Sequence, residues 1–539
     1  MVDGSSEGGD ADAFRYKPRT FKRHWSKPTE GEVNIFPGPG WGNNIIPIKA
    51  LDEDTRVITL QREIWQFDRT PWYRRLSFLP NNRFYMENIL EELTEPGEWC
   101  LDSEEGIIYF WPPCEPIDEQ EVVAPILDCL VSVRGASWIT ISGFTFTETL
   151  DGDDVQRDGL DGYGAMFPRQ GWKYCGEALH LRRAEHCRIE NNLFYSVGGN
   201  AIYLEGENLR NVIQHNEISY AGANGICVVG SALLHPIFNQ ILDNEIHHCG
   251  VINKFVAGVF MGTSNGTLVA HNFIHHMPHH GINLGTNGLG RNIVEYNEIR
   301  YTCMEIHDTG AINCWMDISS AGIEKQAERC GHIIRHNLIA DTLGCRVDDS
   351  GKVVAPIKET LGIYLDDCTS NCFVYGNIIL RVGHAIQVHL GKNNCIENNI
   401  AVDCGSLVLY ADTVSKRCGN AHMAGFMTGN RTCRNIHYTG YPGAVLFTLN
   451  KWTGREIELS DHNLLFNRVD DRYEIGGSAI DAPLPFAEWQ RMGYDVHSVT
   501  ADPLFVDPEN DDYRLKPESP ALRLGFQPID VHRIGICQR

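Results

Sequence analysis

The sequence predicts an all-β protein: a right-handed parallel β-helix (a solenoid) preceded by a Trp-rich β-segment. Two repeated patterns predict this fold, an Asn between apolar pairs and a Gly or Ala followed by apolar–x–apolar. The surrounding segments alternate apolar and polar residues with period two, which is typical of strands and not of helices. One such unit cannot bury its apolar face alone, whereas stacked units bury a continuous core.

The repeated Asn defines the length of one coil. Most successive Asn residues lie 22 to 28 residues apart, which fits one turn of a β-helix whose coils stack at strand spacing. In stacked turns each Asn amide can bond the Asn of the next coil and satisfy backbone groups of the turn. The predicted ladder comprises Asn192, Asn216, Asn244, Asn272, Asn297, Asn337, Asn377 and Asn399.

The chain divides into four regions. We expect a disordered tail over 1–13 and the Trp-rich β-segment over 14–120, where the repeat is missing. The β-helix is predicted over 121–500. A Pro-rich segment over 501–539 is expected to close the solenoid by covering the open strand edges of its last coil.

The composition argues against several partners. With 46 basic and 70 acidic residues the net charge is −24, so the chain would repel a phosphate backbone and nucleic acid is not an expected partner. No run approaches 18 consecutive apolar residues, so no membrane span or membrane partner is expected. The 18 cysteines contain no C-x-x-C pair and are expected to be mainly buried free thiols.

Several longer phrases carry a family resemblance. NRFYMENILEEL, GIIYFWPP, HDTGAIN, GIYLDDCTSN and ADPLFVDPENDDYRLKPESPALRLG resemble bacterial right-handed parallel β-helix proteins near glycoside hydrolase family 141. The resemblance implies α-L-fucosidase- or xylanase-like chemistry. Relatives usually begin with a secretion signal and further coils, so this chain is expected to lack the start of the pattern. If the start of the pattern is missing, an extracellular or periplasmic location is expected; if it is not missing, a cytoplasmic location is expected.

The second pattern predicts a binding trough. Gly262 and Gly285 should leave space beside Trp315 and Asp366, because alternate residues of each strand point outward and form columns along one sheet. One predicted column holds Tyr203, Cys227, Phe260, Asn283, Asn313, Tyr364 and Gln387, and the other Glu205, Val229, Gly262, Gly285, Trp315, Asp366 and His389. Aromatic rings, amides and a carboxylate around a trough suit a sugar ring. The predicted substrate contacts are Asn283, His307, Asn313, Trp315, Tyr364 and His389.

Acidic residues gather near this trough, on the coils with the two 40-residue Asn intervals. The extra residues should project as loops, roughly 316–329 and 344–359, and long loops on a rigid scaffold usually carry function. Glycoside hydrolysis needs two carboxyl groups with separated pKa values. We predict Asp308 and Asp366 as the essential acids, a wide pair suited to inversion. Glu359, a closer neighbour of Asp308, and Asp367 are the next candidates.

The histidine pairs allow three interpretations. His247-His248 and His275-His276 fall at one repeat position, which favours stacking in a ladder over substrate contact or metal binding. No metal site and no cofactor are therefore predicted.

Three functions remain open at this stage. The favoured one is an enzyme, a glycoside hydrolase acting on a plant or microbial polysaccharide or oligosaccharide. The second is a polysaccharide lyase or uronate epimerase, which would use Ca²⁺ held by Asp366 and Asp367. The third is a non-catalytic carbohydrate-binding β-helix, which would need aromatic platforms but no paired acids.

Overall fold

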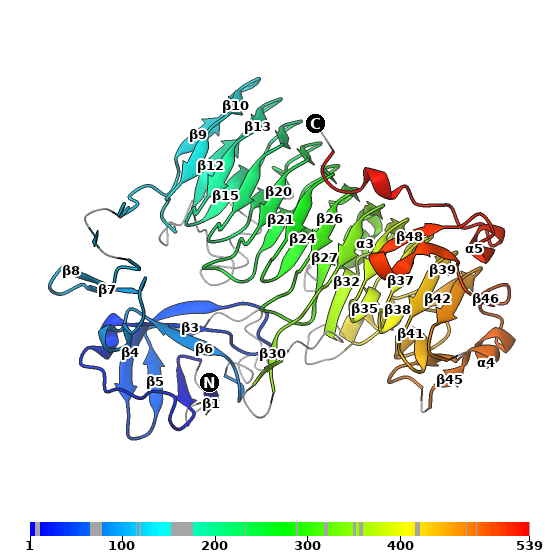
Figure 1. Ribbon diagram of the computed structural model, residues 1–539, viewed down its shortest axis with the longest axis horizontal. Helices are drawn as coiled ribbons and strands as arrows, with labels where there is room; N and C mark the ends of the chain where they lie inside the picture. Colours follow the sequence, from blue (N-terminus) through cyan, green and yellow to red (C-terminus); the bar gives the residue numbers. More distant parts are fainter. Residues whose placement is uncertain are drawn as a thin grey trace.

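The structure is a computed structural model. It describes the whole chain except residues 6–10, 65–77, 115, 118–119, 152–175, 232, 287–288, 317–321, 349–351, 355–358, 415–420, 471, 481 and 538–539. Trp65 and Trp72 of the Trp-rich segment lie outside the described residues, as do parts of both predicted loops. A long solenoid runs across the molecule, and a smaller N-terminal β-domain packs against its side (Figure 1).

Three long sheets, here called sheets 1, 2 and 3, form the walls of the solenoid, and nearly all their strand pairs are parallel. Sheet 1 contains β10 (Thr140–Ser142), β13 (Arg188–Glu190), β16 (Val212–Gln214), β19 (Gln240–Leu242), β22 (Leu268–Ala270), β25 (Ile293–Glu295), β28 (Ile333–Arg335), β33 (Phe373–Tyr375), β36 (Cys395–Glu397), β39 (Asn430–Cys433) and β42 (Ile457–Asp461). Sheet 2 contains β11 (Thr145–Thr147), β14 (Leu193–Tyr195), β17 (Glu217–Ser219), β20 (Glu245–His247), β23 (Phe273–His275), β26 (Glu298–Arg300), β29 (Leu338–Ala340), β34 (Ile378–Leu380), β37 (Ile400–Val402), β40 (Ile436–Thr439), β43 (Leu464–Asn467) and β46 (Val499–Thr500).

Sheet 3 is the longest wall. It contains β9 (Val131–Arg134), β12 (Glu177–Arg182), β15 (Asn200–Glu205), β18 (Ile226–Val229), β21 (Ala257–Gly262), β24 (His280–Thr286), β27 (Thr309–Met316), β32 (Thr360–Leu365), β35 (His384–His389), β38 (Ser406–Ala411), β41 (Ala444–Asn450), β44 (Tyr473–Gly476) and β45 (Leu484–Pro485). Each coil gives one strand to each sheet, so the predicted parallel β-helix is confirmed.

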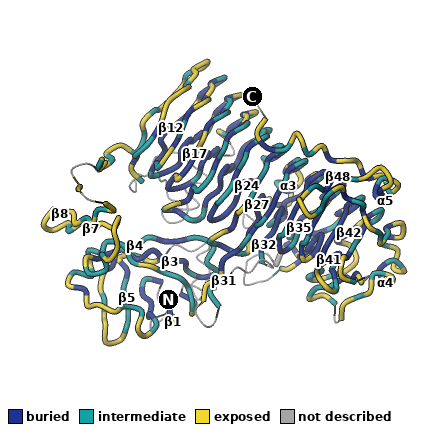
Figure 2. Tube along the Cα trace, viewed as in Figure 1, coloured by how far each residue is buried: buried dark blue, intermediate teal, exposed yellow. Residues whose placement is uncertain are grey.

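The core fills the space between the three walls. Inward residues such as Ile246, Ile274 and Ile299 have no solvent exposure and stack coil upon coil. Figure 2 shows buried residues, in dark blue, on successive coils along the solenoid. The cysteines behave as expected, since most of the described thiols are buried and none of them forms a disulfide.

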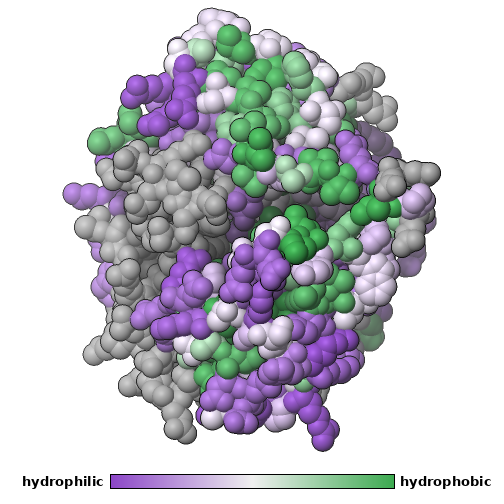
Figure 3. Space-filling model, turned by 90° about the vertical axis from the view of Figure 1, so that its left-hand side faces the viewer, coloured by the Kyte–Doolittle hydropathy of each residue, from purple (hydrophilic) through white to green (hydrophobic). Residues whose placement is uncertain are grey.

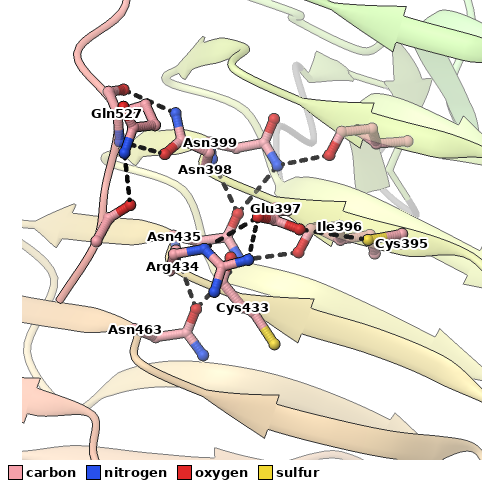
Figure 4. A network of polar contacts seen from close by, with 12 residues as sticks. Cys395, Ile396, Glu397, Asn398, Asn399, Cys433, Arg434, Asn435, Asn463 and Gln527 are labelled. Carbon is pink, nitrogen blue, oxygen red and sulfur yellow. Dashed lines mark hydrogen bonds and ion pairs between the residues drawn. The ribbon is translucent and has the colours of Figure 1, made fainter.

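The predicted Asn ladder is present at the corner between sheets 1 and 2. Each amide donates to the Asn of the next coil, for example Asn216 to Asn244 at 3.0 Å and Asn272 to Asn297 at 2.9 Å. It also donates to a carbonyl of the preceding coil, as Asn272 does to Ile241 at 3.0 Å. Every step of the predicted series is made. The ladder also runs two coils further, through Asn399, Asn435 and Asn463 (Figure 4).

The ladder stabilises an otherwise costly turn. The residue before each ladder Asn has left-handed backbone, with φ of 54° at His215 and 58° at His271, and only at Gly376 is it glycine. Side chains other than glycine pay a steric cost in this conformation. The amide network recovers that cost by satisfying the backbone of the turn.

The N-terminal domain is a six-stranded sheet with its own apolar core. Its strands, in the order β1-β2-β5-β4-β3-β6, are β1 (Val2–Ser5), β2 (Ala13–Tyr16), β3 (Glu32–Ile35), β4 (Asn44–Asp52), β5 (Val57–Leu60) and β6 (Phe84–Glu87). The predicted disordered tail is wrong over Val2–Ser5, because β1 pairs with β2 and Val2 is buried in the core. The remaining short elements of the chain are η1 (Pro28–Glu30), η2 (Leu90–Glu92), β7 (Trp99–Asp102), β8 (Ile107–Phe110), α3 (Ile323–Arg329), β30 (Arg346–Val347), β31 (Val353–Val354), η5 (Ala421–Met423), α4 (Phe486–Arg491), β47 (Phe505–Asp507), η6 (Pro508–Asn510), β48 (Asp512–Leu515), α5 (Pro520–Arg523) and η7 (Val531–Arg533).

The C-terminal segment differs from the expected cap on the last coil. Phe505, Tyr513 and Phe526 pack on the outer face of sheet 2. The chain then runs back along the solenoid, where the amide of Cys537 donates to Asp243 at 2.8 Å. Figure 1 shows this segment as a strap across many coils. Apolar outer residues of sheet 2 explain the course, since the strap buries them.

The first coil presents apolar side chains at the other end. Ile126, Trp138 and Phe144 are 84%, 74% and 57% exposed. Figure 3 looks toward this end of the molecule, and hydrophobic atoms gather in the upper part of the view. Among the described residues, none of the helices has the length and hydrophobicity of a transmembrane helix.

Replacing Asn272 by Leu should lower the free energy of unfolding by roughly 3 kcal/mol. The change removes the Asn272 Oδ1 acceptor from two buried donors of Asn244, its side-chain N–H and its backbone N–H, and each such group costs about 1–3 kcal/mol. Urea unfolding measures the loss. Asn510→Leu, at an exposed turn, is the control, and equal midpoints for the two variants would contradict a stabilising ladder.

Candidate active site

The candidate site lies on the outer face of sheet 3. The predicted register is confirmed there: Phe260 pairs with Asn283, Asn283 with Asn313, and Asn313 with Tyr364. Further along, Tyr364 pairs with Gln387. The outward column of amides and aromatic rings therefore exists, and the acids lie at both ends of its strands.

Asp308 immediately precedes β27, at a corner with a φ of 54°. Its backbone N–H donates to the carbonyl of Glu359 on the next coil at 3.0 Å. The side chain remains accessible to solvent. Enough protein surrounds it that burial raises the pKa of the Asp308 carboxyl, and the charge of Asp366 raises it further. This carboxyl therefore holds its proton more readily than an ordinary aspartic acid.

Asp366 follows β32 and is held in place by two donors. His389 Nδ1 lies 2.7 Å from Asp366 Oδ1, and the backbone N–H of Asp367 donates to the same oxygen at 2.8 Å. Burial alone would lower the pKa of His389, but hydrogen bonds and charges from Asp366 and Asp367 raise it well above its usual value. His389 is thus an imidazolium that fixes Asp366.

Asp367 belongs to the same cluster. His389 Nδ1 also lies 3.5 Å from Asp367 Oδ1. Burial, followed by the charge of Asp366, raises the pKa of Asp367 to about 6. One ligand atom from each of Asp366, Asp367 and His389 falls within 4.8 Å of the other two, so these three groups have the spacing of a cation site.

Two neutral rings face the acids. Burial raises the pKa of Tyr364 well above its usual value, and the charges of Asp366, Asp308 and Asp367 add to the effect. Burial lowers the pKa of His280 to about 4, against an opposing effect of Asp366. His280 Nδ1 contacts the carbonyl of Gly310 at 3.0 Å and therefore carries the ring proton. Its Nε2, which can only accept, makes no hydrogen bond with a described residue.

Asn283 is a buried amide in the same column. It has no solvent exposure, and neither its oxygen nor its nitrogen bonds to any described part of the chain. Buried amide groups nearly always form hydrogen bonds, because a buried donor or acceptor without a partner costs free energy. Asn283 therefore keeps a buried donor and a buried acceptor without partners among the described residues of the column. Its neighbour Asn313 is 6% exposed.

The N-terminal domain contributes to this site. The Trp41 side chain donates a hydrogen bond to Asp308. This hydrogen bond lowers the Asp308 pKa, whereas burial and the charge of Asp366 raise it by more. Gly40 lies beside His307, since a side chain added there would meet the imidazole at 4.0 Å. Asn43 donates to the carbonyl of Ile252 at 2.9 Å and fixes the domain on the solenoid.

Glu359 lies beside Asp308 on the next coil, as the register predicted. Its carboxylate, however, is bound by Arg346 at 2.7 Å, and the charge that raises the Asp308 pKa comes from Asp366. Trp315 is only 8% exposed and packs with Phe260 in an apolar cluster. The predicted open trough with an exposed Trp315 platform is therefore wrong at that position. His307 is half-buried, and its Nδ1 lies 3.1 Å from the carbonyl of Cys345.

Sequence reasoning missed Trp41 and His280. His280 begins the strand one coil before Asp308, so the same repeat alignment contained the signal. Trp41 lies in the phrase Gly-Pro-Gly-Trp-Gly, but no repeat connects it to the solenoid. Only the docking of the two domains brings it to Asp308.

Replacing Asp308 by Asn should raise the melting temperature at pH 7. The pKa of Asp308 is higher in the folded protein than in the unfolded chain, so ionising this carboxyl at high pH destabilises the folded state. This loss of folding free energy disappears when the pH falls below the ordinary aspartate pKa near 3.8, because the carboxyl is then protonated in both states. The stabilisation should therefore shrink as the pH falls toward 4. Thermal unfolding across pH measures it. Asp341→Asn, which breaks an ion pair with Arg381 at 2.7 Å, should destabilise instead, and a loss of stability in both variants would contradict the assignment.

Solved structures with a similar fold have little sequence in common with this chain. One titled "Glycoside hydrolase" has a TM-score of 0.50 and 14% identity, over 79% of this chain and 76% of that chain. The PfbA surface adhesin of Streptococcus pneumoniae has a TM-score of 0.37 and 10% identity, over 66% and 73%. A complex of XylC with xylose has a TM-score of 0.34 and 12% identity, over 94% and 75%. No curated protein matches the sequence.

A family model describes the solenoid itself. It is the model of the right-handed β-helix region, and it matches residues 129–424, which is more than half of the 539-residue chain. The matched range runs from the start of sheet 3 past the acid cluster. The chain belongs to the right-handed β-helix family.

Proposed function

We propose that this protein is a glycoside hydrolase, with Asp308 and Asp366 as its two essential acids. The single observation that carries the proposal is electrostatic. The charge of Asp366 raises the Asp308 pKa, while His389 and the Asp367 N–H hold Asp366 in place. Two carboxyl groups in unlike surroundings are what glycosidic bond cleavage requires.

Asp308 takes the role of general acid. Its raised pKa keeps a proton available, and its accessibility lets the carboxyl reach a glycosidic oxygen. The proton passes from Asp308 to the leaving oxygen as the bond to the anomeric carbon breaks.

Asp366 takes the role of general base toward water. The hydrogen bond from His389 orients Asp366 Oδ1. With Asp308 as acid and Asp366 as base toward water, the proposed reaction inverts the anomeric carbon, and the Glu359 carboxylate is left paired with Arg346. Asn283, Asn313, His307, Tyr364 and His280 are proposed to bind sugar hydroxyls around these acids. The substrate class is a plant or microbial polysaccharide.

A polysaccharide lyase is the second candidate. The spacing of Asp366, Asp367 and His389 favours it, since a Ca²⁺ ion there would neutralise a uronate carboxylate. The raised pKa of His389 argues against it, because an imidazolium already supplies positive charge to both carboxylates. Hydrolysis without a metal is therefore the better proposal.

The Asp308→Asn variant and the Asp366→Asn variant should each have a turnover lower by about a thousandfold or more, since each substitution removes one proton-transfer step. Reducing ends released from a polysaccharide panel measure turnover, and absorbance of unsaturated uronates detects lyase products. Glu397→Gln, on sheet 1, is the control and should retain activity. Near-normal turnover in Asp366→Asn together with a large loss in Glu359→Gln would replace inversion by a nucleophilic mechanism. Activity abolished by a chelator and restored by Ca²⁺ would favour the lyase.

Replacing Trp41 by Phe should move the basic limb of the pH–activity profile to higher pH. The Trp41 hydrogen bond stabilises the Asp308 carboxylate and lowers its pKa, so its removal raises the pH at which the general acid loses its proton. Initial rates from pH 4 to 9 measure the limb. Trp138→Phe, at the exposed end of the solenoid, is the matched control. An unchanged or lowered basic limb would contradict the assignment of Asp308 as the acid.

A further inference from the structure

Four histidines lie together on the outer face of sheet 2, away from the acid cluster, and three of them converge. His247 and His248 follow one another on one coil, and His275 and His276 on the next. The Nδ1 atoms of His247 and His248 lie 2.8 Å apart, and those of His275 and His276 lie 2.7 Å apart. One ring nitrogen of each of His247, His248 and His275 falls within 4.8 Å of the other two.

Ring stacking holds this array together. His247 stacks on His275 with ring centroids 4.8 Å apart and planes 4° apart, and His248 stacks on His276 at 4.7 Å and 7°. Tyr220 continues the second stack beyond His248 at 5.1 Å. The predicted ladder packing is present. Within each consecutive pair one Nδ1–H donates to the other Nδ1, so one ring of each pair presents an Nδ1 lone pair.

The imidazoles are ready to act as ligands. Burial lowers the pKa of His247, His248 and His275, and neighbouring imidazoles lower it further at His248 and His275, to about 4 at His275. A metal binds the neutral ring, so near pH 7 the ring that donates within each pair only has to shift its proton from Nδ1 to Nε2. Glu245 lies 3.5 Å from His275 Nε2 and favours a proton on that nitrogen, which leaves Nδ1 with its lone pair.

We propose that His247, His248 and His275 bind one divalent transition-metal ion, with Zn²⁺, Cu²⁺ and Ni²⁺ as the candidate ions and His276 as the hydrogen-bond partner of His275. Imidazole suits these ions, and zinc–nitrogen bonds are about 2.0–2.1 Å long. Two ligands at that distance are separated by about 3.3 Å in a tetrahedral site. The paired Nδ1 atoms must therefore move apart by about half an ångström, which small rotations of the rings supply. The ion would link two adjacent coils of the solenoid.

Zn²⁺ titration of the full-length protein, after removal of bound metal with a chelator, tests the site. Isothermal titration calorimetry should show one Zn²⁺ per chain at pH 7.5, and the melting temperature should rise with Zn²⁺. Co²⁺ in place of Zn²⁺ should give the visible absorption of a nitrogen-rich site. His275→Ala should abolish this binding, and Glu245→Gln should weaken it about tenfold, since it removes a partner of a ligand.

Matched variants identify the site. His271→Ala, in the neighbouring stack with Tyr296, should keep full affinity because His271 belongs to none of the groups of converging ligand atoms among the described residues. The His497→Ala variant should also keep full Zn²⁺ affinity. Loss of Zn²⁺ binding in that variant would instead assign the ion to the group formed by Asp461, His462 and His497. Binding retained in a folded His275→Ala protein would overturn the proposal. So would the absence of any binding to the parent chain, which would leave a stacking ladder only.

Discussion

The hydrogen bond between one Asn and the Asn of the next coil is the interaction on which the rest of the structure depends. Each ladder amide contacts three consecutive coils, as Asn272 does through Asn244, Asn297 and Ile241. The ladder lets a left-handed turn follow most strands of sheet 1 without glycine. Because the turn is the same in every coil, the three walls keep their register over the whole solenoid, and outward side chains align into columns.

The acids of the candidate site lie at corners, where the columns of sheet 3 end. Asp308 has left-handed backbone at the entrance of β27, and Asp367 has it just after β32. A corner residue is presented by two stacked coils at once, so its position is fixed more firmly than in an isolated loop. The site is nevertheless electrostatically unfavourable, because Asp366 raises the pKa of Asp308. Titratable residues that lower the stability of the fold in this way are typical of functional sites.

Much of the site was predictable from the repeat alone. The periodicity put Asn283, Asn313 and Tyr364 in one outward column, and the structure confirms their register. Other features depend on contacts between distant segments. Trp41 reaches Asp308 only because the N-terminal domain docks on the solenoid. The turn of Glu359 toward Arg346 depends on a loop that the repeat does not specify.

The sequence by itself determined the solenoid, its register and its ladder. These follow from short-range alternation and from a repeat that every coil shares, so each unit carries the information needed to stack on the next. The tertiary structure decided what covers the walls: the strap on sheet 2, the burial of Trp315, and the approach of Trp41 to Asp308. Those contacts join non-repeating segments far apart in the chain. No local pattern encodes such a pairing, because its free energy arises only when both folded surfaces meet.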